Sequence, residues 1–323
     1  MTASGNAVLL SKDPLWHEIE LPLCGVYHPL GFRLNLATNS RHVLQAAHEA
    51  WSSYAPEFDR QPLEIRVIVQ PEGGLADGPP SFRGQGSLFS NVFDRHNFGV
   101  YEVNSLSGYC FVSEMTAATH IRFRLHFLES MTYAMLAQRH AVPLHAAAVM
   151  RRGAGFLLCG RSGAGKSTLA FACAQAGWTF VSDDATWLPV DVEGRVAIGR
   201  PSHARFREDA PRLFPSLDRY AAEQRPNGKM TIEAPTADFG NVRTAVRCSA
   251  DHLVLLERGA ARPRLVPLRT ADVIERLLDD GPGYGDRVRL MHERALERLG
   301  EISAWRLEYT TLDQALDLLA KIA

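Results

Sequence analysis

One segment of the sequence has the residue types and the spacing of a phosphate-binding loop. Its residues, together with the one that follows, are Gly160, Arg161, Ser162, Gly163, Ala164, Gly165, Lys166, Ser167 and Thr168. The stretch from Gly160 to Ser167 matches the pattern GxxxxGK(S/T) in full. Glycines let the backbone curl around a phosphate chain, and the amide groups at the start of a following helix point toward it. We expect Lys166 to bind the outer phosphates of ATP and Ser167 to bind Mg²⁺.

The segments on either side of this loop support that interpretation. Gly155 to Cys159 is apolar and predicts a buried strand, and Lys166 to Ala176 predicts a helix that ends at Gly177. The alternative is an ordinary glycine-rich turn. Because the phosphate-binding pattern requires a strand before it and a helix after it, the flanks favour the phosphate loop.

Two acidic residues follow the next predicted strand. Trp178 to Ser182 is apolar, and Asp183 and Asp184 come directly after it. The carboxyl ends of parallel strands meet at one edge of a sheet, so we expect both carboxylates to lie beside the phosphate loop. One carboxylate can bind Mg²⁺ and the other can accept a proton. The alternative is a solvated turn capped by two aspartates.

Four further residues are weaker candidates. His145 lies in an apolar segment, where a core histidine is more common than a catalytic one. Lys229, one of four lysines in the chain, ends the turn 226–229 and could close over phosphate, although a solvated turn lysine is the commoner case. Arg205 and Arg207 could supply charge in a transition state, although most arginines of such a chain lie on the surface.

The elements around these residues predict an α/β fold for the second part of the chain. A strand, loop, helix and strand in this order predict adjacent parallel strands joined by a right-handed crossover. Strands are expected at 142–149, 155–159, 178–182, 252–257 and 305–309, with a turn at 151–153. Helices are expected at 166–176, 271–278, 287–299 and 312–322, with a linker at 279–286.

The first 140 residues predict a separate α+β region. The expected elements are a helix at 40–54, a strand at 63–69, a hairpin of 98–103 with 108–112 around Asn104 and Ser105, and one long helix at 116–138. After His140 the sequence pattern changes to short apolar segments, which predict strands, separated by glycine-rich turns. We therefore divide the chain into residues 1–140, for substrate recognition or assembly, and residues 141–323, which carry the nucleotide-binding residues.

Composition and charge argue against several classes of protein. The 323 residues are 46% hydrophobic and 22% charged, with a formal net charge of -1, so we expect a soluble globular chain without nucleic-acid or membrane partners. The five cysteines are widely spaced without a CxxC pair, and the histidines lack metal-binding spacing, which argues against a zinc site. With no signal peptide or membrane span in the sequence, we expect a cytoplasmic location.

Three segments together resemble the core of the HPr kinase/phosphorylase C-terminal domain. They are Leu144 to Val149, Gly160 to Thr168 and Phe180 to Asp184. In that family a histidine strand precedes the phosphate loop and a double aspartate follows it after one helix, an order shared in outline with phosphoenolpyruvate carboxykinase. The resemblance implies a P-loop kinase core of this type for residues 141–323. Tyr27 to Phe32 is similar to HPr kinase-related proteins of peptide-modification systems, including lasso-peptide kinases.

The resemblance also implies roles for individual residues. Lys166 and Ser167 would hold the nucleotide phosphates and Mg²⁺. Asp183 would be the general base on the acceptor hydroxyl, with Asp184 as a further Mg²⁺ contact and His145 as a partner to the carboxylates or phosphate. Chemistry alone does not decide which aspartate does which job.

We therefore expect an ATP-dependent phosphotransferase that moves the γ-phosphoryl group to a hydroxyl of a peptide, protein or amino-acid-like acceptor. One alternative is a nucleotide-gated scaffold of a peptide-modification system that hydrolyses ATP slowly or not at all. Another is a carboxykinase-like enzyme acting on a small acid, which would need a basic pocket. A peptide or small carrier protein is the expected partner, and a homo-oligomer is compatible with the sequence.

Overall fold

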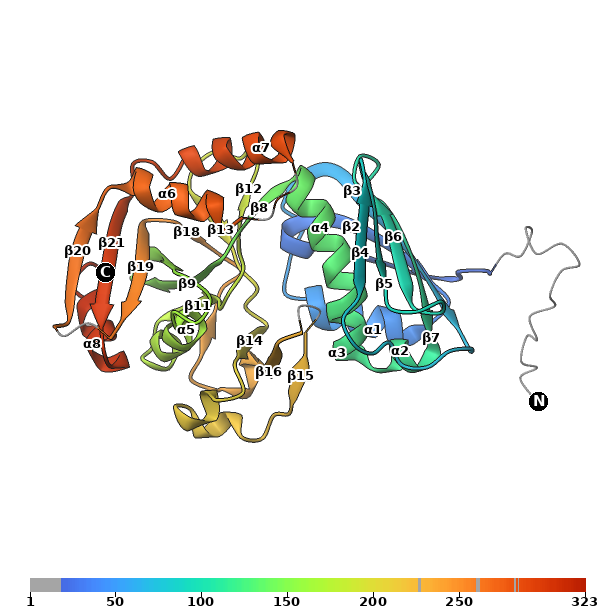
Figure 1. Ribbon diagram of the computed structural model, residues 1–323, viewed down its shortest axis with the longest axis horizontal. Coiled ribbons are helices and arrows are strands. Elements are labelled where there is room, and N and C mark those ends of the chain that lie inside the picture. The colour runs from blue at the N-terminus through green and yellow to red at the C-terminus, as the bar shows by residue number, and fades with distance from the viewer. Residues whose placement is uncertain (1–18, 226–227, 260–261, 282, 284) are drawn as a thin grey trace, which may run out of the picture.

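The computed structural model describes residues 19–225, 228–259, 262–281, 283 and 285–323 (Figure 1). The first 18 residues, 226–227 of the expected turn, and 282 and 284 of the expected linker lie outside the described part. Two seven-stranded sheets and their helices make up most of the fold, which is mixed α/β. The strands of one sheet come from residues 23–113, and those of the other from residues 146–309.

The first sheet has the strand order β1-β2-β3-β7-β6-β5-β4. Strand β3 is parallel to its neighbours β2 and β7, and the other neighbouring pairs are antiparallel. The strands are β1 (Leu23–Tyr27), β2 (Phe32–Thr38), β3 (Phe58–Gln70), β4 (Ser81–Gln85), β5 (Leu88–Val92), β6 (Phe98–Glu102) and β7 (Ser107–Ser113). The expected hairpin is confirmed as β6 and β7, and the expected strand at 63–69 lies within β3.

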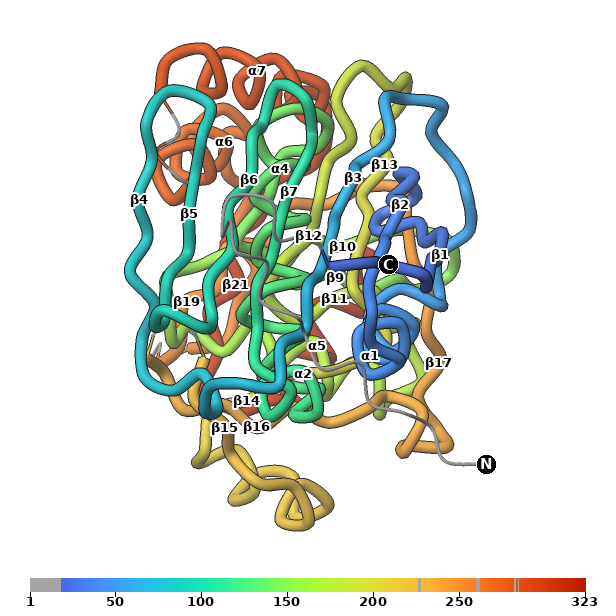
Figure 2. Tube along the Cα trace, turned by 90° about the vertical axis from the view of Figure 1, so that its right-hand side faces the viewer, coloured from blue at the N-terminus to red at the C-terminus, as the bar shows by residue number. Residues whose placement is uncertain are grey.

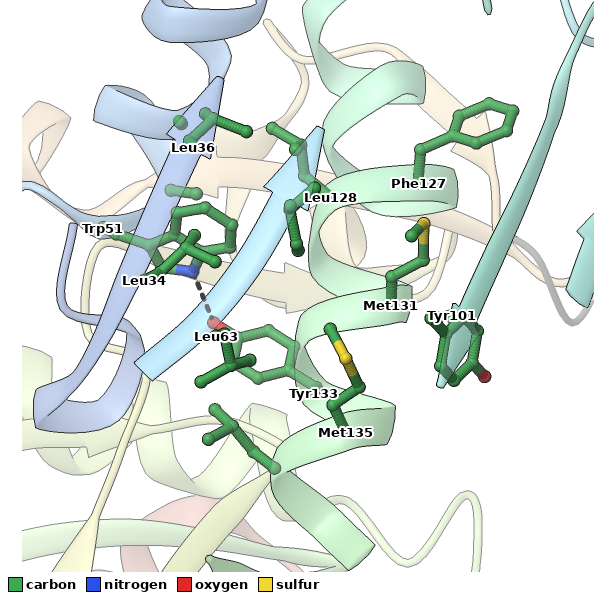
Figure 3. Close-up of a cluster of buried hydrophobic side chains, with 14 of the residues drawn as sticks. Leu34, Leu36, Trp51, Leu63, Tyr101, Phe127, Leu128, Met131, Tyr133 and Met135 are labelled. Carbon is green, nitrogen blue, oxygen red and sulfur yellow. Dashed lines mark hydrogen bonds between the residues drawn. The ribbon is translucent and has the colours of Figure 1, made fainter. Parts of the chain in front are cut away.

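Helices cover one face of this sheet (Figure 1). They are α1 (Arg41–Trp51), α2 (Glu114–Ala118), α3 (His120–Phe123) and α4 (Glu129–Arg139). Met131 of α4 lies against Gly99 of β6 and Gly108 of β7. Trp51 of α1 donates its indole N–H to the hydroxyl of Tyr133 at 3.2 Å (Figure 3). Figure 2 looks onto the first sheet, with β4 to β7 in front of the second sheet.

The expectation of one long helix at 116–138 is wrong. Thr119, with φ -89° and ψ 75°, separates α2 from α3, and residues 124–128 form a π-helical segment before α4. The hydroxyl of Thr119 donates to the carbonyl of Met115 at 3.0 Å, and this back-bonding of threonine is known to bend helices. The apolar stripe in the sequence does not reveal these breaks, because each of the helical segments still turns its apolar side toward the sheet.

The second sheet has the strand order β17-β11-β9-β10-β19-β21-β20. β10, β19 and β21 are parallel neighbours. The strands are β9 (Ala146–Arg151), β10 (Ala154–Cys159), β11 (Thr179–Ser182), β17 (Arg243–Thr244), β19 (His252–Arg258), β20 (Arg264–Leu268) and β21 (Ser303–Tyr309). The expected strands at 252–257 and 305–309 are thus confirmed.

Two expectations about these strands are wrong. β10 and β11 are not adjacent, because β9 lies between them and is antiparallel to both. Positive φ angles at Arg152 and Gly153, 50° and 91°, make a tight hairpin that folds β9 back onto β10. The single strand expected at 142–149 is divided at His145, because β8 (Ala141–Leu144) pairs with β12 (Thr186–Pro189) in another sheet.

Helices cover both faces of the second sheet. α5 (Lys166–Gln175) and α8 (Leu312–Leu319) pack on the face that carries Ala147 and Val149 of β9. α6 (Thr270–Asp279) and α7 (Asp286–Glu297) pack on the opposite face, with Ala146 and Ala148. All four helices were expected from the sequence at nearly these bounds. A sheet buried on both faces needs strands that are apolar throughout, and β9 has that composition.

Two smaller sheets complete the fold. One contains β8, β12, β13 (Val196–Ile198) and β18 (Arg247–Ser249), and the other contains β14 (His203–Phe206), β15 (Ala222–Gln224) and β16 (Met230–Pro235). α4 lies between the first sheet and β8 (Figure 1). Within the described residues, no helix has the length and apolar character to cross a membrane.

Candidate functional site

Three chain segments leave the second sheet at one edge. The last residue of β10 pairs with the first residue of β9, and the last residue of β11 pairs with the third. Because β9 is antiparallel to both strands, the residue before β9 and the residues after β10 and β11 lie at the same edge. This edge therefore carries His145, the loop 160–167 and the aspartates 183–184.

The loop 160–167 needs glycine at positions that other residues adopt with strain. Gly163 has φ 89°, and a Cβ atom there would lie 3.0 Å from Nη2 of Arg207. Gly165, the N-cap of α5, has φ 94°, and a Cβ atom there would lie 3.3 Å from the hydroxyl of Tyr309. The left-handed region costs other residues about 1–2 kcal/mol. The glycines thus bring the loop backbone close to the side chains around it.

Lys166 points back into the loop that precedes it. Its ammonium group donates to the carbonyl oxygens of Gly160 at 2.8 Å and Arg161 at 3.4 Å, and lies 2.9 Å from Nε2 of His145. The residue is 4% exposed, and burial lowers the pKa of its amine, against the opposing charges of Asp184 and Asp280. The loop therefore surrounds the ammonium group of Lys166, which is the first residue of the ten-residue helix α5.

His145 connects this lysine to the acidic pair. Its Nδ1 atom lies 3.1 Å from Oδ1 of Asp184, while Nε2 faces the lysine ammonium. A lysine ammonium only donates, so Nε2 of His145 accepts and the N–H at Nδ1 donates a hydrogen bond to the carboxylate of Asp184. Although burial opposes it, the hydrogen bond from His145 and the charge of Lys166 lower the pKa of Asp184 to about 2. Asp184 is therefore an anion, and its side chain is 53% exposed.

Asp183 has the opposite surroundings. It is 1% exposed, its Oδ2 atom accepts the backbone N–H of Arg205 at 2.8 Å, and its Oδ1 atom lies 3.8 Å from the guanidinium of Arg205. Burial raises the pKa of Asp183 to about 6, against the lowering effect of Arg205. Ser167, in the first turn of α5, donates its hydroxyl proton to the backbone carbonyl of Asp183 at 3.2 Å. The loop, the helix and the acidic pair are thus directly joined.

Three more cations surround the loop. The ammonium of Lys229 donates to the hydroxyl of Ser162 at 3.2 Å, and the guanidinium of Arg207 lies beside Gly163. Arg258, which the sequence analysis did not single out, lies beside Gly165. Arg258 could have been identified from its place at the end of an expected parallel strand, because the carboxyl ends of β10 and β19 lie at the same edge of the sheet.

This arrangement fits a magnesium nucleotide. The cations of Lys166, Arg207, Lys229 and Arg258 gather around backbone amides at a helix N-terminus, the setting that binds phosphates. No group of three or more metal-ligating His, Cys, Asp or Glu side chains occurs in the described part of the chain. Magnesium in such sites needs only one or two protein oxygens beside the phosphates, and the hydroxyl of Ser167 and the carboxylate of Asp184 are oxygens of that kind.

Comparisons with known proteins find limited similarity. A family described as "SynChlorMet cassette protein ScmC" matches residues 109–201, which cover the end of the first sheet, the loop and the acidic pair. Among curated proteins nothing matches. A solved structure described as the Hpr(Ser) kinase/phosphatase from Coxiella burnetii is 14% identical, with 56% of this chain and 90% of that chain covered and a TM-score of 0.29.

Proposed function

We propose that this protein is an ATP-dependent phosphotransferase that moves the γ-phosphoryl group of ATP to a hydroxyl of a peptide, protein or amino-acid-like acceptor. The observation that carries the proposal is the meeting, at one sheet edge, of a lysine-containing glycine loop, a histidine and two carboxylates. Phosphoryl transfer consists mainly of positioning and charge stabilisation, and these groups supply both.

The phosphate-binding role belongs to the loop from Gly160 to Thr168. Its amides and Lys166 would hold the phosphates, with Ser167 and Asp184 as the protein oxygens for Mg²⁺. When bound, Mg²⁺ neutralises negative charge that develops on the phosphates. His145 holds Asp184 in its ionised form and keeps Lys166 oriented, so it acts through its two neighbours.

Asp183 is proposed as the general base on the acceptor hydroxyl. Its pKa of about 6 is close to the range in which a base both accepts a proton and is ionised near neutral pH. The two aspartates have pKa values on either side of the ordinary value, a separation typical of carboxyl pairs with different roles. For this role the guanidinium of Arg205 has to move away from Oδ1 of Asp183, so that this oxygen can contact the acceptor hydroxyl.

The burial of Asp183 under Arg205 also favours a second candidate function. A nucleotide-gated scaffold of a peptide-modification system needs ligands for phosphate and Mg²⁺ but no accessible base. In that case Asp183 would be a structural partner of Arg205, with contacts at 2.8 Å and 3.8 Å. Phosphate transfer to an acceptor distinguishes the two functions, because only the phosphotransferase performs it.

The domain division accompanies the proposal. We propose residues 141–323 as the nucleotide-binding part, because the loop, the acidic pair and the surrounding cations all come from it. Residues 1–140 would serve substrate recognition or assembly. The ScmC match describes a cassette protein, so the products of neighbouring genes are the first acceptors to test.

Nucleotide affinity of a lysine variant tests the proposal. Lys166→Ala removes the cation inside the loop, and we expect a loss of Mg·ATP affinity of about 10- to 100-fold, the size of a charged hydrogen bond. Lys321→Ala is the matched control, because Lys321 is exposed near the C-terminus. Isothermal titration of both variants and the parent provides the measurement. Equal affinity in all three would overturn the nucleotide site.

A further inference from the structure

A pocket of about 320 Å³ lies against the acidic pair. Its walls come from α4 and from the segments around β8, the start of β12 and the end of α6. The lining residues are Ser130, Tyr133, Ala134, Ala137, Pro143, Leu144, His145, Asp184, Ala185, Trp187 and Asp280. The volume is at the lower end of the range of ligand pockets, about 300–1,000 Å³. A short segment or a single large side chain fits such a space.

The pocket adjoins the place where the outer phosphate would be held. His145 and Asp184 form part of its wall, and His145 contacts the ammonium of Lys166 at 2.9 Å. Asp280, on another wall, is close enough to raise the pKa of the Lys166 amine against the lowering effect of burial. A group bound in the pocket would therefore lie close to Lys166, the residue proposed to hold the outer phosphates.

The lining of this pocket disfavours a negatively charged ligand. Most of the lining is apolar or small, and among the described lining residues neither a lysine nor an arginine occurs. Ser130 and Tyr133 already have partners, because the Ser130 hydroxyl donates to the carbonyl of His126 at 2.6 Å and Tyr133 accepts from Trp51. Asp280 is exposed, and its carboxylate forms no hydrogen bond or ion pair with the side chains that the structure describes. With Asp184 assigned to Mg²⁺, Asp280 is the charged group left for a ligand.

We propose that this pocket holds the phosphate acceptor, and that the acceptor is a peptide whose hydroxyl residue has a basic neighbour that pairs with Asp280. This inference rests on the proposed function. The apolar wall of Ala134, Leu144 and Trp187 receives the hydroxyl residue, and its oxygen faces the acidic pair. A small acid, the substrate of a carboxykinase-like enzyme, meets no cation in this lining.

A thiol placed in the pocket provides a readout that does not depend on catalysis. Ala134 is a half-buried pocket residue on α4, so Ala134→Cys adds a thiol to the lining, and Ser130→Cys is a second position should the first variant fold poorly. Cys24 is exposed and does not line the pocket, so its alkylation, followed by peptide mass spectrometry, is the internal reference.

Three synthetic peptides with capped ends serve as probes, each with one serine between two lysines, two glutamines or two glutamates. They are added with Mg²⁺ and a non-hydrolysable ATP analogue before alkylation. We expect the lysine peptide to protect the pocket thiol at about fivefold lower concentration than the glutamate peptide, the size of exposed ion pairs. Asp280→Asn should remove this preference, and Asp279→Asn, the exposed neighbour outside the pocket, should keep it.

The outcomes separate the pocket from the proposed function. Absence of protection by the lysine peptide, with the analogue bound, would overturn the acceptor pocket, and equal protection by the lysine and glutamate peptides would overturn the role of Asp280. The same peptides with Mg·ATP measure transfer. Protection without transfer supports the pocket as a peptide site and contradicts the phosphotransferase. Loss of analogue binding in the parent protein contradicts the nucleotide site on which both rest.

Discussion

Asp183 and Asp184 are neighbours in the chain with side chains in opposite surroundings. Asp183 is buried against Arg205 with a pKa raised to about 6, and Asp184 is half-exposed beside His145 with a pKa lowered to about 2. The chain bends at these two residues after the end of β11, with the Asp183 side chain buried and the Asp184 side chain exposed. The pair can thus supply a base and a metal ligand from two consecutive positions.

Amide variants of the two aspartates should separate these roles. Asp183→Asn keeps an oxygen that can accept the Arg205 N–H, so we expect Mg·ATP affinity to stay within a few-fold while acceptor transfer falls by about 10²-fold or more. Asp184→Asn should weaken Mg·ATP binding and transfer together. The measurement is nucleotide affinity and single-turnover transfer on the same preparations. Full transfer by Asp183→Asn would refute the base assignment and leave Asp184 as the nearby carboxylate.

At the residue scale, type and spacing predict the members of the site but not their contacts. The motif and the family resemblance pointed to Lys166, His145 and the two aspartates, and the structure brings all of them to one edge. Which aspartate is buried depends on Arg205, from a strand whose pairing with β16 the sequence does not reveal. Arg258 was one arginine among many, so only its position after a strand could identify it.

The loop between β10 and α5 depends on backbone conformation as well as on side chains. Gly163→Ala forces a side chain into φ 89° with its Cβ 3.0 Å from the Arg207 guanidinium. We expect Mg·ATP affinity to fall about tenfold, because either the loop or the arginine must move. Gly153→Ala, at φ 91° in the β9–β10 turn with open space around it, is the matched control. Both variants should lose about 1–2 kcal/mol of stability from backbone strain, and only Gly163→Ala should lose affinity. Equal affinity in the two variants would contradict this role of Gly163.

Among the elements, those with a continuous apolar pattern were predicted best. α5, α6, α7 and α8 and the strands β19 and β21 lie at nearly the expected places. The expectations failed where a strand changes partner at His145, and where the helix expected at 116–138 breaks at Thr119. The first failure depends on tertiary strand pairing and the second on a local bend at Thr119, and the apolar periodicity contains neither.

The π-helical segment at residues 124–128, the second break in the helix expected at 116–138, brings a buried group of charged side chains together. Arg124, in the π-helical segment, donates to Glu129 of α4 at 2.8 Å and also pairs with Glu233 of β16. Glu129 pairs with Arg200, and Glu233 accepts from Arg205 at 2.8 Å. Arg205 in turn contacts Asp183. This charge network thus links α4 to the acidic pair.

The network predicts a pH dependence of stability. Burial opposes it, but the charges of Arg200 and Arg124 lower the pKa of Glu129 from 4.5 to about 2. A carboxyl whose pKa is lower in the folded state contributes stability that is complete above its ordinary pKa of 4.5 and is lost as the pH falls toward 2. We expect Glu129→Gln to cost about 3–5 kcal/mol at pH 7, because it leaves the largely buried guanidinium of Arg200 without its carboxylate partner and removes one of the two carboxylates that pair with Arg124.

At a pH below the folded-state pKa of Glu129 this side chain is protonated and uncharged in the parent protein, as glutamine is in the variant. The difference in unfolding free energy between the two proteins should therefore shrink between pH 4 and pH 2. Glu293→Gln is the control, since Glu293 forms an exposed pair with Arg289 at 3.1 Å that contributes at most about 1 kcal/mol. Urea unfolding of the three proteins at several pH values provides the measurement. A difference that stays constant across this range would contradict the network's contribution.

At the scale of the whole molecule, the boundary near residue 140 divides the strands cleanly but not the contacts. α4 ends at Arg139 and β8 begins at Ala141, so the two parts are joined without a linker. Tyr54 donates to the carbonyl of Gly199 at 2.7 Å, and the rings of Tyr133 and Trp187 lie 5.3 Å apart. The sequence predicted the boundary from a change to short apolar strands and glycine-rich turns, whereas the packing across it depends on side chains far apart in the chain.

This packing predicts that the two parts depend on each other. Expressed alone, residues 141–323 lack Glu129 as the partner of the largely buried Arg200 and lack Tyr133 against Trp187, so we expect a fragment less stable than the full chain. Adding residues 1–140 as a separate chain should restore stability and nucleotide binding. Glu129→Gln in that chain should weaken association by about 10²- to 10³-fold, the cost of breaking a buried pair.

Glu57→Gln in the same chain is the matched control for this experiment. Glu57 pairs with Arg247 across the same boundary, but the pair is largely exposed, so its removal should change association by less than about fivefold. Thermal unfolding of each fragment and of the mixture, with calorimetric titration of one fragment into the other, provides the measurement. A 141–323 fragment as stable as the full chain, with no affinity for residues 1–140, would show that the parts fold independently. Association weakened equally by both variants would show that burial of Glu129 is not what holds them together.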